Sequence, residues 1–249
     1  FTWHRSVFLQ YFFMLLCLSA VLLRGRAVIV ILRPYVYNKS RRGRMCGNQK
    51  GAGHWRKKRR NSMILFFSAT GNSRFAAGLL ADILKDTLVS LNEVFKNGQK
   101  WEFYSEAPFV LVAPVYAWRL PAVIEELLKK AVFEGSREMY IVATVGEHGG
   151  LAGKYAGKIV KDRGMIWKGY REIRMPDNYL PGFPMMSEKE AAAAIRKAVP
   201  LLRETGKAIS GGEILPENRH RKNDRLLSGF VNWSFRRFMA NSKSFTVSE

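Results

Sequence analysis

The stretch MILFFSATGNSRFAAGLLADIL, residues 63–84, decides the fold of this chain. Residues 64–67 form a wholly apolar run, which is typical of a strand buried on both faces of a sheet. After a short polar segment, Phe75, Leu79 and Ile83 repeat at four-residue spacing, as do Ala76, Leu80 and Leu84. This predicts a helix with one apolar face. The stretch therefore predicts a strand, a loop and a helix in direct succession.

The loop between that strand and that helix has the composition of an anion-binding site. It carries hydroxyl, amide and glycine groups and no cation. A dianion there would be held by backbone N–H groups, by hydroxyl donors and by the positive end of the helix dipole. The alternative is a polar turn with a Ser or Asn helix cap and no ligand. The residues of this predicted phosphate loop are Ser68, Ala69, Thr70, Gly71, Asn72 and Ser73.

Further strands and helices alternate along the rest of the chain. Apolar runs bounded by turn residues predict strands at 109–115, 138–145 and 167–175, with a weaker strand signal at 87–89. Apolar stripes predict a helix that begins at Pro121 and helices at 151–162 and 188–210. This alternation predicts an α/β fold, a three-layer doubly wound parallel sheet, with a C-terminal helical extension.

The extension contains an amphipathic pattern at 226–239, which predicts a helix. Its clustered apolar residues are Leu227, Phe230, Val231, Phe235 and Phe238. Such a helix either packs on the domain edge or lies on a membrane surface. The sequence favours edge packing, because Asn232, Arg236 and Arg237 suit an ordinary solvated face.

Three of the predicted loops should meet at one place. Ligands of an open parallel sheet bind beyond the carboxyl ends of the strands, and residues 68–73, 116–121 and 146–150 leave such ends. Tyr116 and Trp118 offer flat rings for stacking, and the glycines of the third loop let the main chain approach a ring edge. Together the loops predict a site for flavin mononucleotide (FMN). Taken singly, Trp118 would be an ordinary packing aromatic and 146–150 an ordinary loop.

These loops resemble those of flavodoxin-like proteins, and more closely those of the flavodoxin half of flavodoxin–ferredoxin fusion proteins from anaerobic microbes. The resemblance covers about residues 63–249 and rests on the motifs FFSATGNS, APVYAWRLP, ATVGEHGG and MPDNYL in this order. It implies that the phosphate loop binds the FMN phosphate, chiefly through Ser68, Thr70, Asn72 and Ser73. It implies ring contacts from Pro114, Val115, Tyr116, Ala117 and Trp118 on one side, and from Thr144, Gly146, Glu147, Gly149 and Gly150 on the other.

The resemblance implies an electron-transfer protein that binds FMN and has ferredoxin or another redox protein as its partner. It divides the chain into an FMN-binding domain at 63–212 and a helical extension or linker at 213–249. The fusion proteins continue with a ferredoxin module after a segment similar to residues 244–249, where this sequence ends. Two alternatives stay open: a flavin-dependent quinone or nitro-type oxidoreductase, and a non-redox phosphate-binding interaction module.

Metal and thiol chemistry are not expected in the domain after residue 63. Both cysteines, Cys17 and Cys46, precede it, so it has no thiolate ligand and no cysteine nucleophile. Its two histidines, His148 and His220, are too few for a histidine metal centre. We expect His148 to be exposed rather than catalytic, and we predict no catalytic residue.

Residues 1–62 differ in composition from the rest of the chain. They hold 14 Lys and Arg and no Asp or Glu, whereas the other 187 residues carry a net charge of +7, so the overall +21 does not indicate a nucleic-acid partner. Residues 7–23 are an apolar run at the lower limit for a membrane span, and Arg24 and Arg26 would place the remainder of the chain in the cytoplasm. The alternative is that 1–62 is untranslated upstream sequence and that a cytoplasmic protein starts at Met63.

Overall fold

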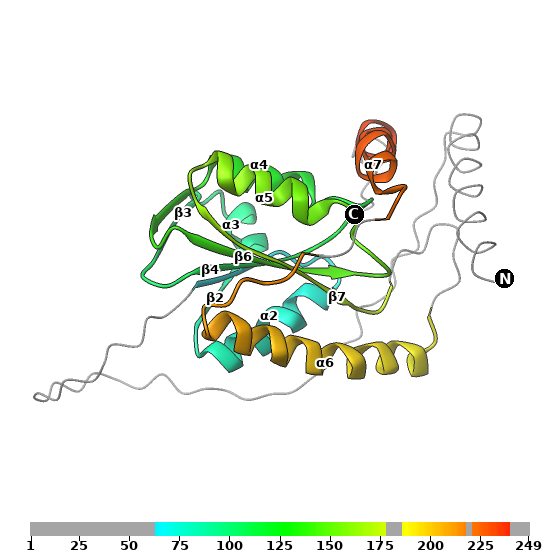
Figure 1. Cartoon of the computed structure of the whole chain (residues 1–249), viewed down its shortest axis with the longest axis horizontal. Helices are drawn as coiled ribbons and strands as arrows, with labels where there is room; N and C mark the ends of the chain where they lie inside the picture. The colour runs from blue at the N-terminus through cyan, green and yellow to red at the C-terminus, as the bar shows by residue number, and fades with distance from the viewer. Residues whose placement is uncertain (1–62, 178–185, 218–220, 240–249) are drawn as a thin grey trace, which may run out of the picture.

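Five parallel strands form the central sheet of the computed structural model, which describes residues 63–177, 186–217 and 221–239 (Figure 1). The strand order is β2-β1-β4-β6-β7, and every neighbouring pair is parallel. The strands are β1 (Met63–Phe66), β2 (Thr87–Ser90), β4 (Phe109–Pro114), β6 (Glu138–Val145) and β7 (Ile166–Arg174). Each lies where the sequence predicts a strand.

The three central strands are buried on both faces, and this explains their unbroken apolar sequences. Side chains of successive residues point to opposite sides of the sheet. Leu65, Leu111 and Ile141 therefore contribute to one core, while Ile64 and Val110 contribute to the other. All five side chains are fully buried.

Helices cover both faces of the sheet, which confirms the three-layer doubly wound fold (Figure 1). One layer consists of α2 (Asn72–Leu84) and α6 (Glu188–Ser210). The other consists of α3 (Leu91–Lys96), α4 (Ala122–Lys130) and α5 (Ala152–Asp162). The long α6 begins at a capping box in which Ser187 and Glu190 bond each other's backbone N–H groups.

A second, two-stranded sheet was not predicted from the sequence. It pairs β3 (Glu102–Ser105) with β5 (Val132–Gly135) in parallel. The rings of Phe103 and Phe133 stack across this pair with centroids 5.7 Å apart. Strands of four residues, one of them largely exposed, are too short to give a period-two pattern in the sequence.

The predicted C-terminal helical extension is present. The short elements α7 (Asp224–Leu226), η1 (Leu227–Val231), α8 (Asn232–Ser234) and η2 (Phe235–Met239) follow one another without a break. We call residues 224–239 the C-terminal helix. It contains two π-helical turns, a form that is rare and often found at functional sites.

Several predictions concern parts of the chain outside the described residues. These are the basic segment 1–62 with its predicted membrane span at 7–23, the end of the MPDNYL motif at 178–180, and the terminal segment 244–249. In the described parts of the chain, no helix combines the length and the apolar character needed to cross a bilayer.

Candidate functional site

The structure brings the three predicted loops to one edge of the sheet. β1, β4 and β6 are parallel neighbours, so the loops that follow them leave the same edge. The chain passes from β1 to β2 on one side and then returns to β4 on the other, so the strand order switches at this point. Direct bonds join the loops: the Ser73 and Thr144 hydroxyls lie 2.7 Å apart, and the Val115 N–H donates to the Thr144 carbonyl at 3.0 Å.

The phosphate loop leaves the start of α2 open for an anion. Gly71 is the N-cap residue of α2, with φ of 104°, and no side chain caps the helix. The N–H groups of the first helical turn therefore have no partner within the helix. Ala69, Thr70 and Gly71 are exposed, while the Ser68 N–H is anchored to the Asn92 side-chain oxygen at 2.9 Å.

Two side chains that the resemblance assigns to the phosphate make other contacts here. The Asn72 amide donates to the Pro176 carbonyl at 2.8 Å, which ties α2 to the segment after β7. Ser73 is buried against Thr144. In contrast, the Ser68 hydroxyl accepts the Gly71 N–H at 3.1 Å and keeps its own proton for donation.

The second loop is a tight turn in a strained backbone conformation. The N–H and carbonyl of Tyr116 bond those of Arg119 at 2.8 and 3.2 Å. Between them, Ala117 and Trp118 have φ of 46° and 62°, a left-handed conformation that costs about 1 to 3 kcal/mol for each non-glycine residue. The turn presents the rings of Tyr116 and Trp118, and burial raises the pKa of Tyr116.

The C-terminal helix holds this strained turn in place. The buried Asn232 amide donates to the Ala117 carbonyl at 2.8 Å and lies 3.4 Å from the Tyr116 carbonyl. Arg236 donates to the Leu120 carbonyl at 2.8 Å. The buried Glu125 carboxylate accepts from Arg119 and from Arg236, each at 2.8 Å, so the turn, α4 and the C-terminal helix share one network.

The same helix also holds the third loop. The fully buried Ser228 hydroxyl accepts the Leu151 N–H at 2.9 Å. Gly150 has φ of 58°, and a Cβ there would lie 2.7 Å from the Ser228 oxygen and 2.9 Å from the Trp118 Cβ. A Cβ on Gly149 would overlap the Glu172 carboxylate. Position 150 therefore requires glycine, whereas a larger residue at 149 would need the Glu172 side chain to move.

His148 lies within the site rather than in open solvent. Its side chain is 18% exposed, and its ring centroid is 6.3 Å from that of Trp118. Its Nδ1 atom accepts the Gly150 N–H at 3.3 Å and lies 3.9 Å from the buried Asp224 carboxylate. Burial, and then the Arg221 charge, lower the pKa of His148, while nearby carboxylates, chiefly that of Asp224, oppose the shift.

Glu147, assigned to the flavin side of the third loop, does not stand as an isolated charge. Arg221 lies 3.5 Å from its carboxylate, and both side chains are nearly half exposed. On the buried side of the loop, burial and the Glu172 carboxylate raise the pKa of Tyr170 well above its usual range. Glu147 is thus paired with a cation, and the Tyr170 phenol is neutral at physiological pH.

The helix residues that hold the two loops were not predicted from the sequence. Asn232, Ser228 and Asp224 are all buried and all contact a loop more than 70 residues away in the chain. Their polar side chains suggest solvent exposure when only the sequence is considered. A polar side chain inside an otherwise apolar helix face was the available signal.

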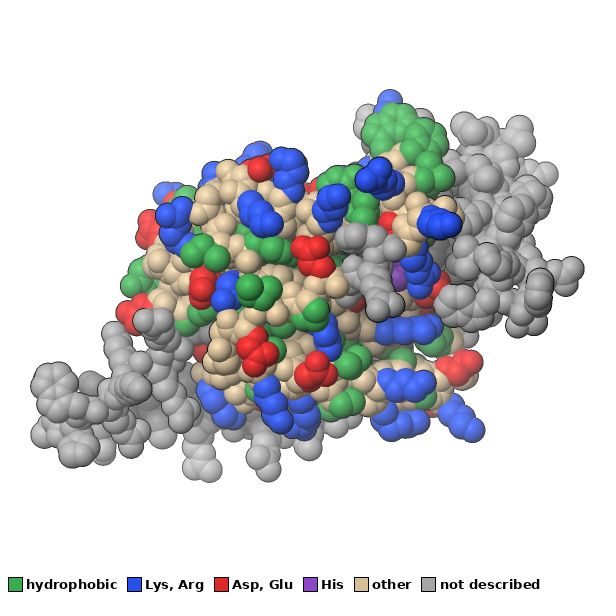
Figure 2. Space-filling model, in the orientation of Figure 1, with side chains coloured by type: hydrophobic (Ala, Val, Ile, Leu, Met, Phe, Trp, Pro, Cys, Tyr) green, Lys and Arg blue, Asp and Glu red, His purple; other side chains and the backbone are tan. Residues whose placement is uncertain are grey.

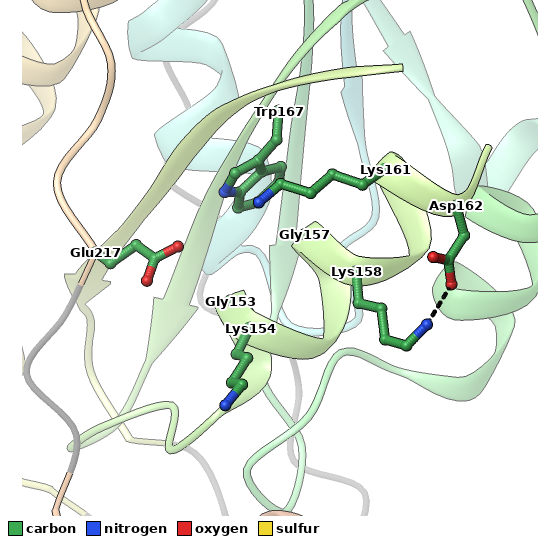
Figure 3. A pocket seen from close by; sticks show the side chains of 8 residues that line it. All are labelled: Gly153, Lys154, Gly157, Lys158, Lys161, Asp162, Trp167 and Glu217. Carbon is green, nitrogen blue, oxygen red and sulfur yellow. Dashed lines mark hydrogen bonds and ion pairs between the residues drawn. The ribbon is translucent and has the colours of Figure 1, made fainter. Parts of the chain in front are cut away.

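A pocket of about 440 Å³ lies along α5 and not among the three loops (Figure 3). Gly153 and Gly157 leave the helix bare, so the rings of Tyr170 and Trp167 pack close to its backbone. The pocket's other lining residues are Lys154, Lys158, Lys161, Asp162 and Glu217. These lysines are exposed, and Lys158 pairs with Asp162 at 2.7 Å, so the pocket is an open surface groove.

Comparison with known proteins gives similarity at the level of structure. No protein-family model matches the chain, and no curated protein matches it. Among solved structures, a Megasphaera elsdenii flavodoxin in its two-electron reduced state is 17% identical, with a TM-score of 0.39, over 60% of this chain and 98% of its own length. A flavodoxin from the domain Archaea is 11% identical, with a TM-score of 0.36, over 59% and 99%.

A Lactobacillus acidophilus flavoprotein in complex with FMN is 12% identical, with a TM-score of 0.35, over 45% of this chain and 93% of its own.

The strand order of the central sheet, 2-1-3-4-5 when its strands are counted along the chain, decides the fold. The fold is flavodoxin-like. In this flavodoxin-like arrangement the three loops described above occupy the switch point of the sheet.

Replacing Asn232 tests whether the C-terminal helix stabilises the strained turn. Asn232→Leu keeps the side chain's size but leaves the Ala117 carbonyl without its donor, so we expect the free energy of unfolding to fall by about 1 to 3 kcal/mol. Urea denaturation measures this loss. The control Asn97→Leu changes an exposed residue and should cost far less. Equal losses for the two variants would contradict the role of Asn232.

His148 should make stability depend on pH. Because its pKa is lower in the folded than in the unfolded chain, the unfolded chain takes up a proton first as the pH falls. The stability is therefore complete above about pH 6.5 and declines as the pH drops toward the folded pKa, by at most about 1.4 kcal/mol per pH unit. Urea denaturation between about pH 7.5 and 5.5 should show a shallower decline for His148→Gln than for wild type. Parallel declines would refute this assignment.

Proposed function

We propose that the chain binds FMN at the edge formed by the three loops and serves as an electron-transfer protein. One observation carries the proposal: the switch point of the sheet has an uncapped helix start at one end and two exposed or half-buried aromatic rings, Tyr116 and Trp118, at the other. An anion site beside flat rings suits a ligand that joins a phosphate to a planar heterocycle.

The phosphate would be held at the start of α2. Backbone N–H groups of the first turn, the Ser68 hydroxyl and the helix dipole are the donors that the exposed loop offers. Asn72 and Ser73 would act mainly by holding the loop, through Pro176 and Thr144. No cation stands among residues 68–73 to balance the phosphate charge.

The ring would lie between the second and third loops. Tyr116, Ala117 and Trp118 belong to a turn whose strained conformation is already fixed by Asn232, so binding need not order it. On the other side, Gly146 to Gly150 present main-chain groups. The Trp118 side chain lies next to Gly150, where the second and third loops meet. We therefore expect FMN bound between these loops to change the environment of the Trp118 ring. Bound FMN would supply the redox chemistry, and the protein would bind and orient it.

The partner and the setting belong to the same proposal. The loop motifs resemble those of flavodoxin–ferredoxin fusions of anaerobes, which points to ferredoxin or another redox protein as partner. The net charge of +7 after residue 62 favours an acidic one. We propose a cytoplasmic domain at 63–212 with its extension at 213–249.

A second candidate function is a flavin-dependent quinone or nitro-type oxidoreductase. His148 favours it, because an imidazole 3.9 Å from a buried carboxylate stands at the rim of the ring site and could move a proton. The electron carrier passes one electron at a time, whereas the oxidoreductase passes two.

The third alternative is a phosphate-binding module without redox chemistry. Such a module would not need the rings of Tyr116 and Trp118.

A charge placed in the phosphate loop separates phosphate binding from folding. Ala69→Asp puts a carboxylate beside the exposed start of α2, so we expect FMN affinity to fall about tenfold or more while riboflavin affinity stays unchanged. The same charge should leave stability unchanged or raise it by about 0.3 to 1 kcal/mol, because it complements the helix dipole. Flavin fluorescence titration measures both affinities.

Ala122→Asp is the matched control, since Ala122 is the exposed first residue of α4. Ala122→Asp should change neither the FMN affinity nor the riboflavin affinity. If Ala69→Asp weakens riboflavin as much as FMN, the phosphate does not bind at α2. A wild-type protein that binds neither ligand would favour the phosphate-binding module.

A redox titration of the FMN-loaded protein distinguishes carrier from enzyme. We expect two resolved one-electron steps, as an electron carrier requires, and no turnover of NAD(P)H with quinone or nitro acceptors. A single two-electron step together with such turnover would establish the oxidoreductase instead. His148→Gln should leave the carrier's electron count unchanged.

A further inference from the structure

The C-terminal helix has a mixed inner face and an apolar outer face, because Leu227 is buried together with several polar side chains. Its buried residues include Asp224, Ser228 and Asn232, which contact the ring loops. The sequence predicts Leu227 and Phe230 in the packed cluster and Asn232 on the solvated face, and the burial of Leu227 is confirmed. The structure leaves Phe230 64% exposed and Asn232 3% exposed.

Large apolar side chains form a row on the outer face of this helix. Leu226, Phe230 and Trp233 are 55%, 64% and 57% exposed, and their spacing of four and three residues places them on one side. The rings of Phe230 and Trp233 stack with centroids 5.9 Å apart. Figure 2 shows these hydrophobic atoms gathered on a protruding end of the molecule. We call these three residues the outer stripe.

Cations flank the outer stripe, and acids are absent from it. Lys222 and Arg237 lie four residues before and after its ends, and Arg225 is adjacent to it; all three are exposed. Residues 225–239 contain no Asp or Glu. The only acid of the helix, Asp224, is buried against the third loop. The exposed face is therefore apolar at its centre and positive at its margins.

We propose that the outer stripe binds the surface of an anionic lipid bilayer, with the C-terminal helix lying in the plane of the interface. Leu, Phe and Trp on one face, flanked by Lys and Arg, form the pattern of interfacial helices, and Trp favours the headgroup region. Anionic headgroups attract the flanking cations. The hydrophobic atoms lie on a projecting end of the molecule, where they can reach a planar surface (Figure 2).

Charge argues against the other occupants of this face. A second copy would bring the same cations against each other. Residues 1–62 hold 14 cations and no acid, so they would be repelled too. An acidic protein satisfies the charge, but three exposed side chains are far fewer than the roughly 20 to 30 residues per partner of a stable protein interface.

Binding through the outer stripe leaves the proposed flavin site intact. The residues that hold the loops, Asn232, Ser228 and Arg236, lie on the other side of the helix. Membrane attachment is thus independent of the proposed redox function, and either can fail without the other.

A local label on the full chain tests the proposal and separates the stripe from the basic segment 1–62. In a Cys17→Ser, Cys46→Ser background, Phe230→Cys carries an environment-sensitive NBD dye. Vesicles of phosphatidylcholine with phosphatidylglycerol should raise its emission severalfold with a blue shift, whereas pure phosphatidylcholine vesicles should not. The control Ile214→Cys labels an exposed residue, 74% accessible, outside the helix, and should not respond.

Variants in the labelled protein then probe the stripe and its margins. Leu226→Ser with Trp233→Ser should abolish the response at position 230. Arg225→Gln with Arg237→Gln should weaken it severalfold and reduce its salt dependence. All four residues are exposed, and urea denaturation checks that folding is retained. Three results would overturn the proposal: an equal response of the label at position 214, an equal response to both vesicle types, or no response of the label at position 230 to either vesicle type. A lipid-free response that rises with protein concentration would overturn it in favour of self-association.

Discussion

Parallel pairing among β1, β4 and β6 is the constraint on which the rest of the structure depends. Each strand is buried on both faces, so its sequence is mainly apolar and most polar residues lie at or beyond its ends. Parallel order then brings all three ends to one edge. The predicted site residues therefore come from the ends of these strands and from the loops that follow them.

This constraint explains why much of the fold and the position of the site could be predicted from sequence. The apolar runs of β1, β4 and β6 and the stripe of α2 give unambiguous patterns, and the loops follow them in the chain. β3 and β5 could not be predicted, because strands of four residues are too short to show a periodic pattern in the sequence. The side-chain partners of Asn72 and Ser73 were also beyond reach, since Pro176 and Thr144 are distant in sequence and meet them only in the folded domain.

The second loop shows how the domain maintains a conformation that its own residues disfavour. Ala117 and Trp118 both adopt left-handed backbone angles without being glycine. The cost is offset by Asn232, by Arg236 and by the buried Glu125, all supplied from outside the turn. A turn fixed in this way keeps its aromatic rings in place before any ligand arrives, which lowers the entropy lost on binding.

The buried polar side chains of the C-terminal helix follow from the same requirement. Loops at a sheet edge expose carbonyl and N–H groups that need partners, and a helix that covers them must turn polar side chains inward. Ser228 and Asn232 do so for the third and second loops. Once its polar positions are used in this way, the outer face of the helix is free to be apolar. Ordinary amphipathic reasoning assumes an apolar core beneath a helix. It places Leu227 correctly but misplaces Phe230 and Asn232, because the surface beneath this helix includes backbone groups that need partners.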